Sequence, residues 1–213
     1  MYVLPQYDEL RPEVLHALVR GRPFATLITS VDGDVLANHV PVLVRSNSGP
    51  GGVIVGHVAK ANPVWTTSPS GSRPLIVFHG ENHYISPRWY VSRGEQGKAL
   101  PTWDYAVVHV RGPIEWIHDA AWVQGLIEEM IHTFEPDNDN PWRMSEMSDD
   151  SRKSLLERIV GFRIPVDEIR GKYKLNQRSA PEDRQSIVSA LNTMGTGAAL
   201  AMAQAIRDAG ESP

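Results

Sequence analysis

The chain has 213 residues, of which 41% are hydrophobic and 22% are charged, and its formal net charge is −4 at pH 7. This length and composition are typical of one well-cored globular domain, with or without an appendage. The absence of cysteine excludes disulfides, thiolate metal sites and cysteine nucleophiles. The negative charge argues against the basic face that most nucleic-acid-binding proteins present.

Two further absences bear on location. The sequence has no apolar run of about 18 or more residues, so it predicts no transmembrane helix. Residues 1–8 lack a basic segment followed by an apolar one, so we expect no secretory signal. The sequence therefore predicts a cytoplasmic protein without a membrane partner.

The first two thirds of the chain consist largely of short β-type segments separated by turn signals, after a helix expected over residues 8–20. Asp32-Gly33 is a hairpin signal that joins strands expected over residues 24–30 and 35–45. Pro41 cannot donate to a ladder, which places it at an edge or a bulge. Further strands are expected over residues 52–55, 74–80, 83–86, 106–117 and 162–166, with a turn at 81–82 and no assignment for residues 98–105.

Helical signals follow the strands. Asp119 is the expected N-cap of a core-packing helix that ends near Phe134, and Ser148 or Asp149 is expected to begin another that ends near residue 160. The strand pattern predicts a small barrel with helices over its open ends, that is, a mainly β fold with flanking helices. We place this domain at residues 1–178 and a C-terminal helical tail at 179–213.

The tail resembles a helix-turn-helix in outline, because two helical segments flank Met194-Gly195-Thr196-Gly197. Its second segment, residues 198–207, is mostly alanine and methionine with one basic residue. A recognition helix needs side chains that reach base edges and phosphates. We therefore expect a dimer arm or a packed tail rather than a DNA-reading helix.

Several reaction classes lack their sequence signals. The five histidines of the strand-rich half lie on separate strands, whereas zinc sites use closely spaced pairs, so no metal site is predicted. The chain has no Gly-x-Ser-x-Gly elbow, no Walker loop and no Gly-x-Gly-x-x-Gly after a strand. These absences disfavour nucleophilic hydrolysis and nucleotide binding by those routes.

Residues 56–65, Gly-His-Val-Ala-Lys-Ala-Asn-Pro-Val-Trp, have the features of an anion site. Asn62 is a good N-cap, Pro63 suits the first helical position, and a helix start attracts anions. Lys60 adds a full charge and His57 a polar donor. The alternative is a capped turn with a solvated lysine. With hydroxyls, an imidazole and a stacking ring elsewhere, the chain offers a site for a phosphate-bearing aromatic ligand.

Six strings, found in the same order over residues 1 to about 195, resemble the PaiB family. They are Pro23-Phe24-Ala25-Thr26-Leu27, His39-Val40-Pro41, Gly56-His57-Val58-Ala59-Lys60-Ala61-Asn62-Pro63, Tyr84-Ile85-Ser86-Pro87-Arg88-Trp89-Tyr90, Pro101-Thr102-Trp103-Asp104-Tyr105 and Gly171-Lys172-Tyr173-Lys174-Leu175-Asn176-Gln177. That family belongs to the FMN-binding split-barrel group, which includes relatives of pyridoxamine phosphate oxidase and flavin reductases. Its members are often labelled transcriptional regulators.

The resemblance implies a homodimer of split barrels with FMN held at the subunit interface. It places a first group of residues at the phosphate or along the flavin, and a second group as contacts from the partner chain. The first group is Thr26, His39, Val40, His57, Val58, Lys60 and Asn62, and the second is Lys98, Thr102 and Trp103.

The sequence departs from the family pattern at three positions. The family usually has Arg at the position of Lys60, Asn at that of Asp104 and Ser at that of Asn176. A lysine is a point charge rather than a fork, so it implies weaker phosphate binding. A carboxylate such as that of Asp104 is unfavourable near a phosphate.

Three functions remain open from the sequence. The first is an FMN-binding split-barrel protein, as a flavin-dependent oxidoreductase on a small substrate, with His57 or His39 as the first candidates for an acid or base. The second is a transcriptional regulator of the negative type that binds DNA directly or indirectly. The third is a haem-binding split barrel, because histidines are plentiful.

Overall fold

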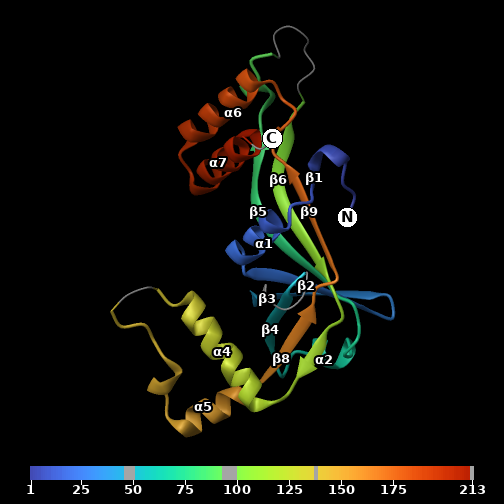
Figure 1. Ribbon diagram of the computed structural model, residues 1–213, viewed down its shortest axis with the longest axis vertical. Helices are drawn as coiled ribbons and strands as arrows, with labels where there is room; N and C mark the ends of the chain where they lie inside the picture. The colour runs from blue at the N-terminus through green and yellow to red at the C-terminus, as the bar shows by residue number, and fades with distance from the viewer. Residues whose placement is uncertain (46–50, 93–99, 137–138, 212–213) are drawn as a thin grey trace. The chain divides into compact units, whose positions relative to one another are not determined.

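The structure is a computed structural model that describes residues 1–45, 51–92, 100–136 and 139–211 (Figure 1). Its strands are β1 (Asp8–Glu9), β2 (Phe24–Val31), β3 (Asp34–Arg45), β4 (Val53–Ala59), β5 (Leu75–Ile85), β6 (Thr102–Arg111), β7 (Glu115–Ile117), β8 (Ile159–Pro165) and β9 (Glu168–Lys174). Its α-helices are α1 (Pro12–Gly21), α2 (Val64–Thr67), α4 (Ala120–Phe134), α5 (Asp149–Leu156), α6 (Pro181–Met194) and α7 (Gly197–Glu211).

The strands of the described residues join in one sheet, in the order β1-β9-β6-β5-β2-β3-β4-β8-β7. Every strand pair with a defined register is antiparallel. The predicted class, mainly β with flanking helices, is confirmed. The chain folds as two compact units, each built from separate segments, and the predicted division at residue 178 stays a prediction. Unit 1 comprises Met1–Arg11, His79–Val108 and Arg170–Pro213, and unit 2 comprises Pro12–Phe78 and His109–Ile169.

Unit 2 begins with the β2–β3 hairpin. The Asp-Gly signal is confirmed, because Asp32 and Gly33 adopt positive φ angles of 51° and 90° and so match the right-handed twist of the paired strands. The hairpin register places Thr26 opposite His39. The unit's core contains fully buried side chains from β2, β4, β5 and β8, among them Leu27, Ile54, Phe78 and Phe162.

Strands β3 and β4 separate at Pro41. They pair only from Val42, opposite Gly56, to Arg45, although β3 begins at Asp34 and β4 ends at Ala59. Pro41 lies one residue before the first of these pairs, so its missing N–H leaves no ladder bond unmade on that side. The predicted edge position is therefore confirmed. Beyond it, His57 pairs with Gly161 of β8 instead.

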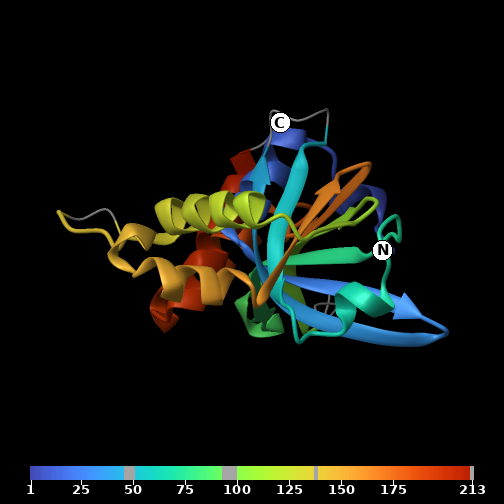
Figure 2. The same cartoon turned by 90° about the horizontal axis from the view of Figure 1, so that it is seen from below.

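Helix α4 packs against β3 and β4 (Figures 1 and 2). The Asp119 carboxylate accepts the Trp122 N–H at 2.7 Å, which confirms the predicted N-cap. Leu126 and Met130 are buried against Leu43 and Val55. Burial of an aliphatic side chain stabilises the fold by about 1.5–3 kcal/mol, so this stripe fixes α4 to the sheet.

In unit 1, α6 and α7 pack side by side (Figure 1). Gly195 ends α6 in the left-handed conformation, with φ of 66°, and lets the chain reverse. The buried cluster joins the two helices to residues of β5 and to Leu175, which follows β9: Ile85, Leu175, Ile187, Leu191, Ala199, Met202, Ala203 and Ile206. The alanines and methionine of α7 are therefore core residues, as expected for a packed tail.

Several predicted strand boundaries are wrong. In the first three cases below, pairing with a neighbouring strand extends a strand beyond its local signal, and in the last the expected strand is divided. β5 runs unbroken through the expected turn at residues 81–82. β6 begins at Thr102, within the unassigned stretch. β4 continues to Ala59, so His57 and Val58 lie on a strand rather than after one. β6 ends at Arg111, whereas a single strand was expected to run on to residue 117.

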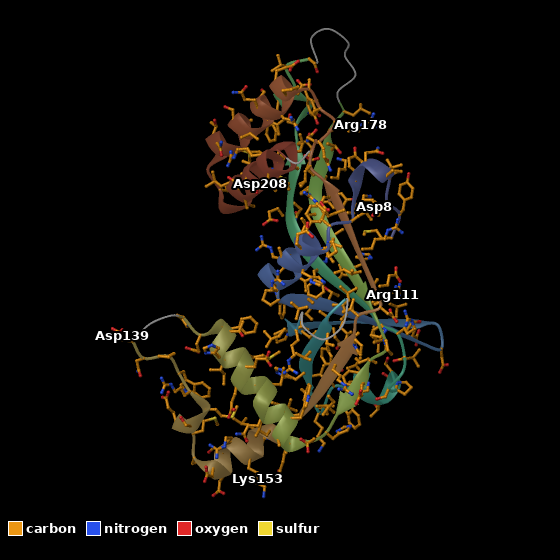
Figure 3. All side chains as sticks on the ribbon, in the orientation of Figure 1. Asp8, Arg111, Asp139, Lys153, Arg178 and Asp208 are labelled. Carbon is orange, nitrogen blue, oxygen red and sulfur yellow. The ribbon has the colours of Figure 1, made fainter. Side chains whose placement is uncertain are left out.

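Two predicted helices are shorter than expected. α1 begins at Pro12 rather than residue 8, because Asp8 and Glu9 pair with β9 as β1 (Asp8 is labelled in Figure 3). Ser148 caps α5 as predicted, but the helix ends at Leu156. Leu155, near the end of this helix, is 48% exposed.

Asp183 links α6 to the segment that follows β5. Its buried carboxylate accepts the Ser92 N–H at 3.0 Å and the Ser92 hydroxyl at 2.7 Å. Burial raises the pKa of Asp183, but these bonds and one from the Val91 N–H together hold the pKa below its usual range. Such a carboxyl stabilises the fold above its unfolded pKa, and the contribution is lost as pH falls through the folded pKa.

We expect Asp183→Asn to lower the free energy of unfolding by about 1–3 kcal/mol at pH 7. The difference from wild type should shrink below about pH 4, where the carboxyl of the unfolded chain is protonated. Urea denaturation across pH measures both effects. Glu182→Gln, the same charge change on an exposed side chain of the same helical turn, is the matched control and should have little effect. A difference that stays constant down to about pH 3 would contradict the lowered pKa.

Candidate functional site

In unit 2, Thr26 and His39 form a polar pair on the hairpin. They lie opposite each other, and the Thr26 hydroxyl and His39 Nδ1 are 3.2 Å apart, within hydrogen-bond distance. The Phe24 ring lies 6.2 Å from the imidazole, centroid to centroid, and is 68% exposed. This face of the hairpin combines an aromatic ring with two groups that donate or accept hydrogen bonds, which suits a planar ligand with polar edges.

Lys60 lies just beyond the end of β4, and its backbone is fixed on both sides. Its N–H donates to the Arg158 carbonyl at 2.7 Å, and its own carbonyl accepts the Trp65 indole N–H at 2.9 Å. The Lys60 side chain is exposed and forms no hydrogen bond or ion pair with the described residues. The turn therefore presents an uncompensated positive charge at a fixed point of the backbone.

Asn62 fixes the same turn to β3. Its Oδ1 accepts the Val64 N–H at 3.0 Å, and its Nδ2 donates to Asn38 Oδ1 at 2.7 Å. The predicted bond from Asn62 to the start of the helix is present, but α2 begins at Val64 with Pro63 at the N-cap position, one residue later than expected, and it has only four residues. The dipole of so short a helix is small, so Lys60 supplies most of the positive potential here. The Asn38–Asn62 bond therefore ties the Lys60 turn to β3, the strand that carries His39, although the side chains of Asn38 and His39 lie on opposite faces of that strand.

His57 is half-buried on β4, and its Nδ1 atom is buried without a hydrogen-bond partner among the described residues. Burial lowers the pKa of His57, so the ring is neutral at pH 7. Val40 and Val58, also predicted as cofactor contacts, are each 4% exposed. Their side chains belong to the core, which leaves only their backbone groups to meet a ligand.

The remaining predicted contacts belong to unit 1, except that Lys98 lies outside the described residues. Thr102 and Trp103 are the first residues of β6. The Trp103 side chain is 55% exposed, and its ring meets the Tyr84 ring edge-on at 6.3 Å. The Thr102 hydroxyl accepts a hydrogen bond from Lys174 Nζ at 2.7 Å.

Asp104 and Asn176, two departures from the family pattern, are partners. Asn176 Nδ2 donates to Asp104 Oδ2, and Lys174 Nζ donates to Asp104 Oδ1 at 3.3 Å. Burial raises the pKa of Asp104, and Lys174 and Asn176 offset only part of this rise. The carboxylate is 1% exposed, so it takes part in an internal network. Its position therefore removes the objection that an exposed carboxylate at residue 104 would repel a phosphate.

Three residues of these surroundings were not assigned roles from the sequence. Phe24 and Asn38 stand next to predicted residues, and the alternation of a strand would have placed Phe24 on the Thr26 face. Lys174 belongs to a string that carried the family resemblance, but its partners lie about 70 residues away. No local pattern in the sequence signals such a contact.

The described ranges contain no group of three or more His, Asp and Glu side chains arranged to hold a metal ion. In the same ranges, no helix has both the length and the apolar character needed to cross a bilayer.

A family described as "Putative FMN-binding domain" (FMN_bind_2) matches residues 1–168. The chain belongs to this family. The chain is 29% identical over 208 residues to the Bacillus subtilis protein "Protease synthase and sporulation protein PAI 2", with 98% of this chain and 97% of that protein covered. It is 27% identical over 246 residues to "Uncharacterized protein AN0679" of Emericella nidulans, with 99% and 98% covered. The predicted PaiB family and its cofactor, FMN, are confirmed.

Solved structures share the fold. The flavocytochrome Anf3 from Azotobacter vinelandii superposes with a TM-score of 0.55 at 12% identity, over 78% of this chain and 69% of that one. The "FAD and Heme binding protein" from Mycobacterium smegmatis superposes with a TM-score of 0.54 at 17% identity, over 79% and 73%. The predicted split-barrel fold is confirmed. At these identities the likeness concerns the fold alone.

The side chains of unit 2 fit an FMN group chemically. Lys60 is an unpaired cation suited to a phosphate. The Thr26–His39 pair and the Phe24 ring suit the edge and face of a flavin. The orphaned Nδ1 of His57 provides a buried polar atom that a ligand can satisfy.

Proposed function

We propose that this protein is an FMN-dependent oxidoreductase that acts as a homodimer on a small substrate. Lys60 and Asn62 hold the phosphate, with His57 and Val58 beside it. Thr26, His39 and the Val40 backbone lie along the flavin. Thr102 and Trp103 approach from the partner chain.

The observation that carries the proposal is the state of Lys60. Two other basic side chains of unit 2 are neutralised, since Arg45 pairs with Glu129 and Arg73 with Asp167. Lys60 is exposed and has no acidic partner among the described residues, and its backbone is fixed by two hydrogen bonds. An uncompensated cation on a fixed turn is the expected form of a site whose counter-charge arrives with a ligand.

Bound FMN supplies hydride and single-electron transfer, and the protein supplies binding, orientation and electrostatics. The Thr26 hydroxyl orients the His39 imidazole through their 3.2 Å contact and leaves Nε2 to meet a ligand. His57, neutral at pH 7, offers a hydrogen bond without adding charge beside Lys60. His39 is the better candidate for proton transfer, because it is exposed whereas His57 is half-buried.

The two alternatives have less support. The name of the Bacillus relative favours a regulatory role. However, the one basic residue of α7, Arg207, donates to Gln204, and the helix buries its apolar face in unit 1. Haem binding is supported by the name of the Mycobacterium structure. However, the uncompensated charge of Lys60 matches a phosphate group and is no specific signal for a haem.

The test compares FMN with riboflavin, which lacks the phosphate. Titration of the purified full chain, followed by quenching of flavin fluorescence, gives both dissociation constants. Because charge-assisted hydrogen bonds contribute about 1.5–3 kcal/mol, we expect FMN to bind about 10- to 100-fold more tightly. Equal affinity for the two ligands would remove the phosphate assignment. Absence of binding to either would overturn the proposed function.

A further inference from the structure

Lys174, the last residue of β9, makes an unusual set of contacts in unit 1. Its ammonium group has three protons, and it donates to three consecutive residues at the start of β6. The acceptors are the Thr102 hydroxyl at 2.7 Å, the Trp103 carbonyl at 2.6 Å and Asp104 Oδ1 at 3.3 Å. All three donors are therefore used, and all are directed at one short piece of strand.

This ammonium belongs to a wider, partly buried network. Asn176 donates to Asp104, and the Asn176 Oδ1 atom accepts the Tyr90 hydroxyl at 2.8 Å and the Ser179 hydroxyl at 2.9 Å. Burial, with a contribution from Asp104, raises the pKa of Tyr90 to about 12, so this hydroxyl remains a donor at all ordinary pH values. Because each member has a partner, the network has one arrangement and holds Lys174 in place.

The contact with Trp103 sets the backbone from which its indole projects. The Trp103 carbonyl is held by Lys174. The ring is largely exposed, and its ring contact within the described part of the chain is edge-on with Tyr84. The side chain cannot fix its own position by burial, so the backbone must do so. A charge-assisted bond is the stronger type of hydrogen bond available for this.

We propose that Lys174 is a positioning residue, which fixes Thr102 and Trp103 so that the indole is presented to the flavin in one orientation. The flavin part of this inference rests on the proposed function. Lys174 itself touches no ligand. It acts through the backbone and hydroxyl of the two residues that do.

The first measurement needs no flavin. The full chain, with its six tryptophans replaced by 5-fluorotryptophan, is studied by ¹⁹F NMR, and Trp103→Phe assigns the Trp103 signal. Lys174→Met keeps the aliphatic stem and removes the three donors. We expect the Trp103 signal alone to shift or broaden. An unmoved Trp103 signal in a folded Lys174→Met protein would overturn the proposal.

The matched control is Lys172→Met on the same strand. The Lys172 ammonium lies over the rings of Tyr2 and Tyr105, at 5.6 and 5.3 Å, and donates to the Tyr2 carbonyl rather than to residues 102–104. Its loss removes the same charge from the same strand. The Trp103 signal should stay in place, and a shift as large as that of Lys174→Met would argue against a specific role for Lys174.

The second measurement is FMN affinity. Stacking on an aromatic side chain is worth about tenfold in affinity or more, so Trp103→Ala should weaken FMN binding by about that factor. Lys174→Met should cause a similar loss, and the double variant should lose no more than either single one. Losses that multiply would show that the two residues act independently and would overturn the proposal.

Lys174→Met leaves the Asp104 carboxylate buried without its cation, which can prevent folding. The double variant Asp104→Asn/Lys174→Met removes this charge and still lacks the ammonium, so it replaces the single variant if that one does not fold. The two proposals fail separately. If the wild-type chain binds no FMN, the proposed function fails, whereas the NMR comparison still decides whether Lys174 positions Trp103.

Discussion

Replacing Lys60 by alanine is expected to weaken FMN binding about 10- to 100-fold and to leave riboflavin binding nearly unchanged. The Lys60 side chain has no partner among the described residues, so its removal breaks no internal contact and the fold should be unaffected. The loss should therefore fall on the phosphate alone. Fluorescence titrations of both flavins against the variant measure it, and the loss should be smaller at high salt because exposed charges are screened.

Two variants make this result specific. Lys153→Ala removes the same charge from an exposed position on α5 (labelled in Figure 3), and it should bind FMN as the wild type does. Lys60→Arg introduces a planar fork that matches phosphate geometry, so it should bind FMN at least as tightly as Lys60 does. An equal loss of FMN and riboflavin binding in Lys60→Ala would mean that the residue supports the turn rather than the phosphate.

Local signals predicted the parts of this fold that depend on neighbouring residues. The Asp32-Gly33 turn, the Asp119 and Ser148 caps and the bond between Asn62 and the Val64 N–H each follow from contacts within a few residues, and all are present. The apolar stripe of α4 follows from helical periodicity. Such features are set by backbone sterics and by nearby hydrogen bonds, which a sequence pattern contains in full.

The element boundaries that the sequence did not predict are set by contacts between segments far apart in the chain. β4 runs past its apolar stretch to Ala59 because β8 supplies a partner there. The start of β6 has mixed polar and aromatic residues without periodicity, and contacts from Lys174 hold it. Similarly, Asp8 and Glu9, which were expected to begin α1, form a strand because they pair with β9. In each case the deciding contact lies far away in the sequence.

The same division applies to the candidate site. The family strings identified Lys60, Asn62, Thr26 and His39 as a group. The structure pairs Thr26 with His39 and ties the Lys60 turn to the same strand, β3, through the Asn38–Asn62 bond. The strings did not show that the Asn62 side chain is already used to fix the turn, or that Asp104 is buried. Lys60 is therefore the main candidate to bind the phosphate, and the burial of Asp104 explains why a carboxylate is tolerated at residue 104.

Gly112→Ala is expected to be the most destabilising of the variants considered, by about 3 kcal/mol or more in the free energy of unfolding. Gly112 follows β6, and a Cβ atom there would lie 1.9 Å from the Pro165 carbonyl oxygen and 2.9 Å from Ile164 Cγ2. The nearer atom belongs to the backbone of β8, which cannot rotate away as a side chain can. Two strand ends must therefore separate near residues whose N–H and C=O groups bond across the gap, Asp167 to Arg111 at 3.1 Å.

Gly125→Ala provides the opposite result on the same unit. Gly125 lies within α4, and no atom would stand within 4 Å of its new Cβ, apart from the neighbouring residues and the backbone of the helix itself. Alanine is a better helix former than glycine by about 1 kcal/mol, so this variant should be slightly more stable than wild type. Urea denaturation followed by circular dichroism compares the two variants.

If Gly112→Ala unfolds at the same urea concentration as the wild type, β8 does not approach residue 112 closely, and the end of β6 is free to move. If both variants lose stability equally, the loss reflects added volume in general. Only a large loss at Gly112 beside a gain at Gly125 identifies the backbone contact as the cause.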